Sequence, residues 1–317
     1  MMIENWRMRK KQTIAVNGLI EEILAAVLNS DDVGSIKKAN ETESDDRNIN
    51  IIETGFPELD KASVVLKPSN LVLIAAKNGM KATSLALSIA KHIAIEQNRR
   101  IGIICLKETP EMIAVRLLCN IADVNPTSVM HGWLSTEEYY DIEKAMNALN
   151  NASINISTVS INSNILINAT KNLKKQHDVE CIVLEASRIS ARRCMPIMKA
   201  MKEVAEIDDI PIMVAMRLPA NKKSGKRKRA YIEDTSKWQT ILDIADLFMS
   251  VYCEDRIHLL KADANYNILA IQEAEMTELR VKAKIAINKN GSDCEVTTNL
   301  AYNHNFERFE RYYATND

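Results

Sequence analysis

The stretch "LVLIAAKNGMKATSLAL", residues 71–87, decides how this 317-residue chain is interpreted. Six small or apolar residues lead into a short loop that contains one glycine, Gly79, and the residues after the loop have the spacing of a buried helix. A buried strand, a loop and a helix start are the three parts of a phosphate-binding loop. The stretch therefore predicts either a nucleotide site or a strand-helix turn that binds no ligand.

The phosphate-loop pattern G-x-x-x-x-G-K-[ST] is only partly present. Lys81 stands where the second glycine is expected, Ala82 stands where the lysine is expected, and Thr83 occupies the hydroxyl position. A shift of one residue turns a side chain by about 100° around a helix axis, so Lys81 is not expected to replace the missing lysine. The free amides of the helix start still favour weak anion binding. The candidate nucleotide-binding residues of this loop are Lys77, Asn78, Gly79, Met80, Lys81, Ala82 and Thr83.

Beyond residue 50 the sequence alternates between strands and helices, which predicts an α/β fold with a mostly parallel sheet flanked by helices. Two further extended runs around Lys289, Asn290 and Gly291 predict a C-terminal β-hairpin. The expected strands are 71–76, 101–106, 154–158, 181–184, 212–215 and 247–252. The expected helices are 83–98, 109–124, 135–150, 163–177 and 194–208.

The first 50 residues differ in character from the rest. Residues 1–30 predict an amphipathic helix over 13–28 with a basic lead-in, and residues 31–50 are polar and charged, as in a flexible linker. Residues 51–317 are expected to form the core domain. The apolar face of the helix needs a partner, which is either the chain's own core or a neighbouring subunit.

Composition narrows the classes of function. The net charge is -1, so nucleic-acid binding would require local clusters of Lys and Arg. The apolar runs are too short to span a membrane and the amino terminus lacks the features of a signal peptide, which predicts a cytoplasmic protein. Cys105 and Cys181 lie in apolar strands, as is typical of reduced, buried thiols. The five histidines show no paired spacing with cysteines, so no structural metal is expected.

Residues 51–94 resemble the start of the ATPase domain of DnaB-type replicative helicases, which begins with T-G-F-x-x-L-D and continues into a phosphate loop. The resemblance extends to residue 311, and includes the pair Ala245 and Asp246 before a late strand. It implies a RecA-like core of the P-loop NTPase type and a role in DNA replication. The matching residues of the first segment are Thr54, Gly55, Phe56, Leu59, Asp60, Met80, Thr83, Leu85 and Ala86.

The resemblance also implies where catalytic groups should lie. The family's water-activating glutamate falls on Lys107, and Glu108 next to it should face the other way if strand alternation continues. The metal-holding aspartate becomes Glu185. Glu108 and Glu185 are the remaining catalytic candidates, and Thr83 and Glu185 would hold Mg²⁺ only together with a nucleotide.

Two further family positions are changed. The glutamine of the sensor strand falls on Arg217, and the lysine and arginine that the hairpin presents to a neighbouring subunit become Ile287 and Lys289. Phosphoryl transfer depends on positioned charge, and an arginine finger alone contributes about 10³ to 10⁵ in rate. We therefore expect ATP and Mg²⁺ binding to be weak or absent, and helicase-type hydrolysis to be weak or lost.

Two basic segments follow neighbouring predicted strands and are candidates for binding single-stranded DNA. The alternative is that both are solvated loops without a ligand, since no aromatic residues are interleaved with the charges. The first segment contributes Arg188, Arg192 and Arg193, and the second contributes Lys222, Lys223, Lys226, Arg227, Lys228 and Arg229.

Three functions remain open from the sequence. The preferred one is a DnaB-like helicase-core protein that binds single-stranded DNA, a helicase or other replication proteins without effective hydrolysis. The second is an active DNA-dependent ATPase or helicase with a displaced lysine. The third is a structural protein that forms homo-oligomers, including rings, and binds neither ATP nor DNA. Because only about 50 residues precede the core, the family's primase-contacting domain is not expected.

Overall fold

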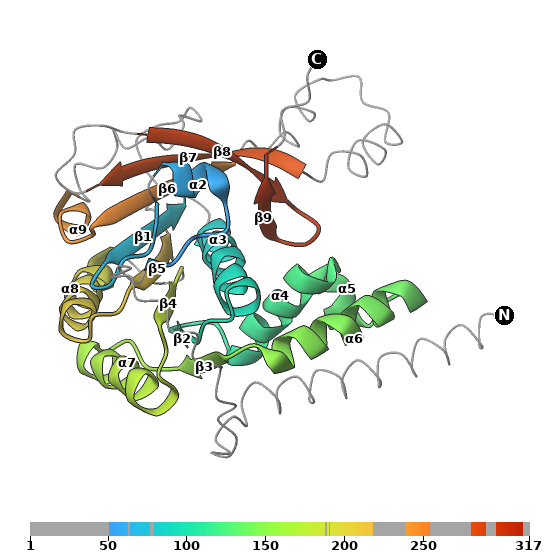
Figure 1. Cartoon of the computed structure of the whole chain (residues 1–317), viewed down its shortest axis with the longest axis horizontal. Helices are drawn as coiled ribbons and strands as arrows, with labels where there is room; N and C mark the ends of the chain where they lie inside the picture. The colour runs from blue at the N-terminus through green and yellow to red at the C-terminus, as the bar shows by residue number, and fades with distance from the viewer. Residues whose placement is uncertain are drawn as a thin grey trace, which may run out of the picture.

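The computed structural model describes residues 51–62, 64–76, 79–187, 189, 191–217, 239–253, 280–289 and 296–312. The helix and linker predicted before residue 51 lie outside these ranges. The described residues form three layers, in which helices cover both faces of a nine-stranded sheet (Figure 1). The strand order is β3-β2-β4-β5-β1-β6-β7-β8-β9.

Six strands form the parallel part of the sheet, and each predicted strand is confirmed with ends within two residues. Their side chains are almost all buried because helices cover both faces, which explains the continuous apolar runs in the sequence. The strands are β1 (Leu71–Ala76), β2 (Ile101–Cys105), β3 (Ile154–Thr158), β4 (Cys181–Ala186), β5 (Ile212–Arg217) and β6 (Leu247–Cys253).

The five predicted long helices are also confirmed, and the first of them begins earlier than expected and ends in a π-helical turn. Three short helices were not predicted: α2 (Pro57–Lys61), α5 (Pro126–His131) and α9 (Gln239–Leu242). The long helices are α3 (Gly79–Lys91) with its π turn η1 (His92–Glu96), α4 (Pro110–Ala122), α6 (Thr136–Asn151), α7 (Ser163–His177) and α8 (Ala191–Ile207).

Local sequence explains where two of these helices start. The Thr109 side chain accepts a hydrogen bond from the Met112 amide at 3.3 Å, and Pro110 occupies the first turn of α4. Ser135 and Glu138 form a reciprocal capping box at the start of α6. Both caps satisfy amides that the helix itself leaves unpaired.

Strand alternation divides the core into two halves. Val72 and Ile74 of β1 face the half that contains α3, α4 and α6, whereas Leu71 and Leu73 face the half that contains α7 and α8 (Figure 1). The face to which a strand residue belongs can therefore be read from its position in the strand. The same alternation determines which side chains of β4 and β5 lie on the side of α3.

The carboxyl-terminal strands extend the sheet with antiparallel pairing. β7 (Arg280–Lys289) pairs with β6 on one side and with β8 (Val296–Asn303) on the other, which confirms the predicted hairpin, although its turn lies outside the described residues. The short strand β9 (Arg308–Arg311), which was not predicted, pairs with β8. Its charged sequence lacks the apolar run of the other strands.

The two cysteines predicted to be buried lie in the central strands β2 and β4. Cys105 and Cys181 are fully buried, as predicted, and burial raises the pKa of each thiol to about 12. Within the described ranges, no helix combines the length and the hydropathy that crossing a membrane would require.

Candidate nucleotide site

The loop between β1 and α3 is the centre of the predicted nucleotide site. Lys77 and Asn78 lie outside the described residues, while Gly79 and Met80 already belong to the first turn of α3. The helix thus begins two residues before Lys81, which stands at the second glycine position of the phosphate-loop pattern. Residues 81–83 therefore lie in the first turns of α3.

The side chains of this first turn point in different directions. Ala82 and Thr83 are buried, with 0% and 1% of their surfaces exposed. The Lys81 ammonium lies 5.2 Å from the centroid of the Tyr302 ring on β8, in a cation–π contact. Burial raises the pKa of Tyr302 to about 12, so its hydroxyl stays protonated at neutral pH. The charge of Lys81 is therefore held towards the C-terminal strands.

Glu185 of β4, which the sequence predicts as a metal ligand, is 1% exposed. Its Oε1 accepts hydrogen bonds from the Ser187 amide, at 2.9 Å, and from the Ser187 hydroxyl. Its buried Oε2 accepts no hydrogen bond from the residues that the structure describes. Cys181 and Val183 pack on the side of α3, so alternation places Glu185 on that side too. A carboxylate oxygen in this state suits a Mg²⁺ ion, alone or with a nucleotide.

The loop after β2 contains an exposed lysine and a buried carboxylate at the positions predicted for activating water. Lys107 is exposed, and Glu108 is buried against Arg116 of α4, with 3.5 Å between Oε2 and Nη1. The Arg116 Nη2 donates to the Ser84 Oγ at 2.9 Å, and its Nε lies 3.4 Å from the Glu307 Oε2. Glu108 is therefore part of a structural ion cluster and is a poor candidate for activating water.

Arg116 is the central residue that the sequence reasoning missed. It is 6% exposed and links α3, the loop after β2, and the turn between β8 and β9. The signal in the sequence is a single charged residue within the apolar helix "PEMIAVRLLCNIA". A charge in such a position requires buried partners, although the sequence does not show which residues they are.

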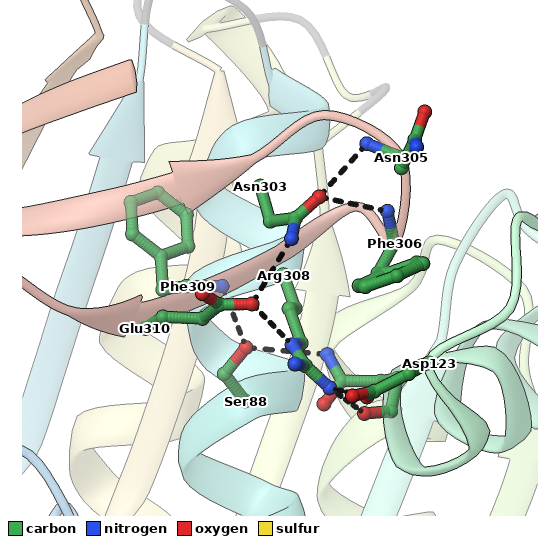
Figure 2. Close-up of polar contacts among 9 residues, drawn as sticks. Ser88, Asp123, Asn303, Asn305, Phe306, Arg308, Phe309 and Glu310 are labelled. Carbon is green, nitrogen blue, oxygen red and sulfur yellow. Dashed lines mark hydrogen bonds and ion pairs between the residues drawn. The ribbon is translucent and has the colours of Figure 1, made fainter. Parts of the chain in front are cut away.

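A second cluster of polar contacts joins the start of β9 to the carboxyl-terminal end of α4, as Figure 2 shows. The Arg308 guanidinium donates to the Asn120 carbonyl at 2.8 Å and forms an ion pair with Asp123. The Phe309 amide donates to the Ser88 Oγ of α3 at 3.1 Å. Charged and polar side chains thus join the C-terminal strands to α3 and α4 along the flank of α3.

The remaining predicted catalytic positions lie on β5 and β7, which β1 and β6 separate in the sheet. Arg217 is the last residue of β5, is exposed, and is the register partner of Ala76 at the end of β1. Ile287 of β7 is 1% exposed and packs into the core. Its side chain carries no charge, and its burial also keeps it away from any neighbouring subunit. Lys289 ends β7, and its side chain lies outside the description.

The basic segments can be placed only in part. Arg193 is exposed on α8, the Arg192 side chain and Arg188 lie outside the described residues, and the whole 218–238 segment lies outside them as well. The strands that precede the two segments, β4 and β5, are adjacent and parallel, so both segments begin at the same edge of the sheet. The residues of the second segment are Lys222, Lys223, Lys226, Arg227, Lys228 and Arg229.

Two solved structures share this fold. A structure described as an ATPase domain has a TM-score of 0.66 at 19% identity and covers 84% of this chain and 93% of that chain. A DnaB-like replicative helicase, described with its interactions with primase, has a TM-score of 0.66 at 20% identity and covers 98% of this chain and 77% of that chain. These similarities confirm the predicted RecA-like core.

Curated relatives are replicative helicases. The replicative DNA helicase DnaB of Geobacillus stearothermophilus is 26% identical over 237 residues, which are 71% of this chain and 52% of that protein. The probable plasmid replicative DNA helicase of Chlamydia muridarum is 31% identical over 150 residues, 47% of this chain and 33% of that protein. The chain thus spans about half or less of these relatives' length. The family model described as "DnaB-like helicase C terminal domain" matches residues 51–311, and the chain belongs to this family.

Proposed function

We propose that this chain is a helicase-core protein of DNA replication that binds single-stranded DNA, a helicase partner, or both, with ATP hydrolysis weak or lost. One observation supports the proposal above the others. The lysine position of the phosphate loop is Ala82, which is fully buried inside α3, and the neighbouring Lys81 is held over Tyr302. Neither residue supplies the charge that stabilises a transferring phosphoryl group.

The other catalytic positions support the same conclusion. Lys107 replaces the carboxylate that would activate water, Glu108 is paired with Arg116, and Ile287 is buried in the core. Each of these positions either lacks the group that would speed hydrolysis or has it engaged elsewhere. Several such losses combine to far more than the effect of any one, because phosphoryl transfer relies on charge and positioning.

The binding part of the proposal rests on charge at one edge of the sheet. The segments after β4 and β5 begin side by side, and together residues 188–193 and 222–229 carry nine basic residues, six of them in the second range. Cations at the ends of adjacent strands can follow one phosphate backbone, and such binding weakens steeply with salt.

Hydrolysis is tested with purified full-length protein, with and without single-stranded DNA. We expect ATP turnover at the background level in both conditions, and no change in Lys81→Ala. DNA-stimulated turnover that disappears in Lys81→Ala would instead establish an active ATPase with a displaced lysine.

DNA binding is tested across a salt series with a single-stranded oligonucleotide of mixed sequence. We expect the logarithm of the affinity to fall linearly with the logarithm of the salt concentration, with a shallower slope when Lys226, Arg227, Lys228 and Arg229 are replaced by serine. Binding that is absent or insensitive to salt would favour the structural alternative.

An exposed apolar surface supports a second proposal, that the chain forms homo-oligomers. Met130, Trp133 and Tyr140 on and beside α5 and α6 are 51%, 61% and 69% exposed, and a groove along α6 is lined by Tyr139 and Tyr140 among others. Such a patch is typical of a protein interface. The predicted amphipathic helix at 13–28 follows a basic lead-in of Arg7, Arg9, Lys10 and Lys11, and this lead-in complements the acidic excess of α6.

Light scattering tests this second proposal at several protein concentrations. We expect the mass to exceed that of one chain, and to decrease when Trp133 and Tyr140 are both replaced by serine. The same decrease is expected when residues 1–30 are deleted. A single-chain mass in the unchanged protein would contradict the proposal.

A further inference from the structure

Arg217 ends the strand that lies beside the predicted phosphate site. β5 is the immediate neighbour of β1, and the register pairs Arg217 with Ala76, the last residue before the loop. Adjacent strands lie about 4.8 Å apart, whereas β2, which ends near Lys107, is three strand positions away from β1. Of these two cations, only Arg217 is next to the loop.

Arg217 also lies on the face of the sheet that α3 covers, which is the face of the predicted phosphate site. Met213 and Ala215 of β5 pack in the same half of the core as α3, and residues two apart in a strand share a face. Arg217 is two residues after Ala215 and therefore shares this face, at the end of β5 that lies beside the end of β1. Its side chain is thus on the face on which Thr83 and Glu185 lie.

Arg217 is not used by the described part of the fold. It is exposed and makes no hydrogen bond or ion pair with the residues that the structure describes. By contrast, Arg116 and Arg308 are each held by several acceptors. An arginine without such a structural partner can be replaced at little cost in stability, which makes its role testable.

A second, independent feature of this edge indicates a ligand. Glu185 is 1% exposed, and its Oε2 is buried without a hydrogen-bond partner among the described residues. A buried, unsatisfied carboxylate oxygen is costly unless a cation or donor joins it. Positive charge at Arg217, the amino-terminal end of the α3 dipole and a carboxylate for a metal ion together suit a magnesium-bound polyphosphate.

We propose that Arg217 supplies the phosphate-binding charge that Ala82 lacks, so that the site holds the polyphosphate of a nucleotide without hydrolysing it. The inference rests on the proposed function and names the ligand class of the same site. The guanidinium provides a planar fork that can donate two hydrogen bonds to one phosphate group. It binds the phosphates from the strand side, whereas the water-activating position at the end of β2 carries Lys107.

The test is calorimetric titration of the full chain with inorganic pyrophosphate and with ADP, each with Mg²⁺. We expect saturable binding that Arg217→Met weakens by about tenfold to a hundredfold, the range of one lost charge-assisted contact. Arg217→Lys should retain part of the affinity, because an ammonium keeps the charge but not the fork. Lys81→Ala should change the affinity less than about twofold.

Arg100→Met is the matched control, since Arg100 is an exposed arginine at the opposite end of the strands. It should bind both probes like the unchanged protein, and the urea midpoint of Arg217→Met should be unaltered. Equal binding by Arg217→Met and the unchanged protein would overturn the inference, as would the absence of saturable binding. Salt-dependent DNA binding would still support the proposed function in that case, so the two failures can be distinguished.

Discussion

The start of α3 and the flank of the same helix differ in how they carry charge. At the start, the lysine position is a buried alanine, and the cation at the adjacent strand end, Arg217, makes no ion pair with the described residues. Along the flank, Arg116 and Arg308 are each held by several partners that join α3, α4 and the C-terminal strands. Charge along the flank therefore holds the fold together, whereas the cation beside the start of α3 is not engaged by the described residues.

The largest effect is expected from Arg116→Met. This change leaves Glu108 buried without its cation, and breaking a buried ion pair from one side typically costs about 3–5 kcal/mol. We expect the free energy of unfolding in urea to fall by that amount. Arg100→Met, which removes an exposed arginine, should cost less than about 1 kcal/mol. An equal fall in the free energy of unfolding in both variants would show that Arg116 stabilises the fold no more than an exposed arginine does.

A smaller loss is expected from Arg308→Met. The Arg308 Nε donates to Glu310 at 2.8 Å, and the guanidinium also binds the Asn120 carbonyl and Asp123. The side chain is 13% exposed, so water replaces part of what is lost, and we expect a cost of about 2 kcal/mol. Hydrogen exchange should quicken in residues 304–311 and remain unchanged in β3. Uniform quickening throughout the chain would show that the effect of this cluster is not local.

The start of α3 can be altered towards the phosphate-loop pattern with Lys81→Gly and Ala82→Lys together. We expect ADP to bind about tenfold more tightly, because a cation returns to the phosphates. Turnover should stay at background, since Lys107 and Ile287 are unchanged. Without ADP the variant should be less stable, because position 82 is fully buried. Substantial ATP turnover by this variant would show that the remaining positions suffice for hydrolysis.

The smallest effect concerns pH. Burial raises the pKa of Cys181 from its ordinary value near 9 to about 12, so the unfolded chain loses this proton at lower pH than the folded chain does. Stability is therefore lost as pH rises above 9, by about 0.8 kcal/mol for this thiol at pH 9.5. Cys181→Ala should reduce the fall in unfolding free energy between pH 8 and pH 9.5 by this amount. An unchanged fall would mean that other groups dominate the alkaline range.

The parallel sheet and its long helices could be predicted because their signals are local. β1 is a continuous apolar run, β4 begins with four apolar residues, and Thr109 and Pro110 mark the start of α4. The short elements were missed because α5 has only six residues and β9 places charged residues around Phe309. Elements of this size depend on tertiary contacts more than on their own sequence.

The candidate site could be located from the sequence but its charges could not be placed. Lys81 and Tyr302 are more than 200 residues apart, and nothing local indicates that they meet. The Arg116 cluster likewise joins residues from 84 to 307. The pairing of Ala76 with Arg217 depends on which strands become neighbours. Strand order follows from the global fold, so the source of positive charge became visible only in the structure.

The T-G-F segment near residue 55 is fixed by packing and hydrogen bonding within the fold. Gly55 has a φ of 81°, and a side chain there would come within 2.2 Å of the His92 ring. Thr54 is fully buried, and its hydroxyl donates to Asp60 at 2.8 Å. Gly55 is constrained by its close approach to η1 and Thr54 by its hydrogen bond to α2, and neither constraint involves a nucleotide. A signature of this kind reflects packing and not catalysis, so recognising it in other chains is no measure of their activity.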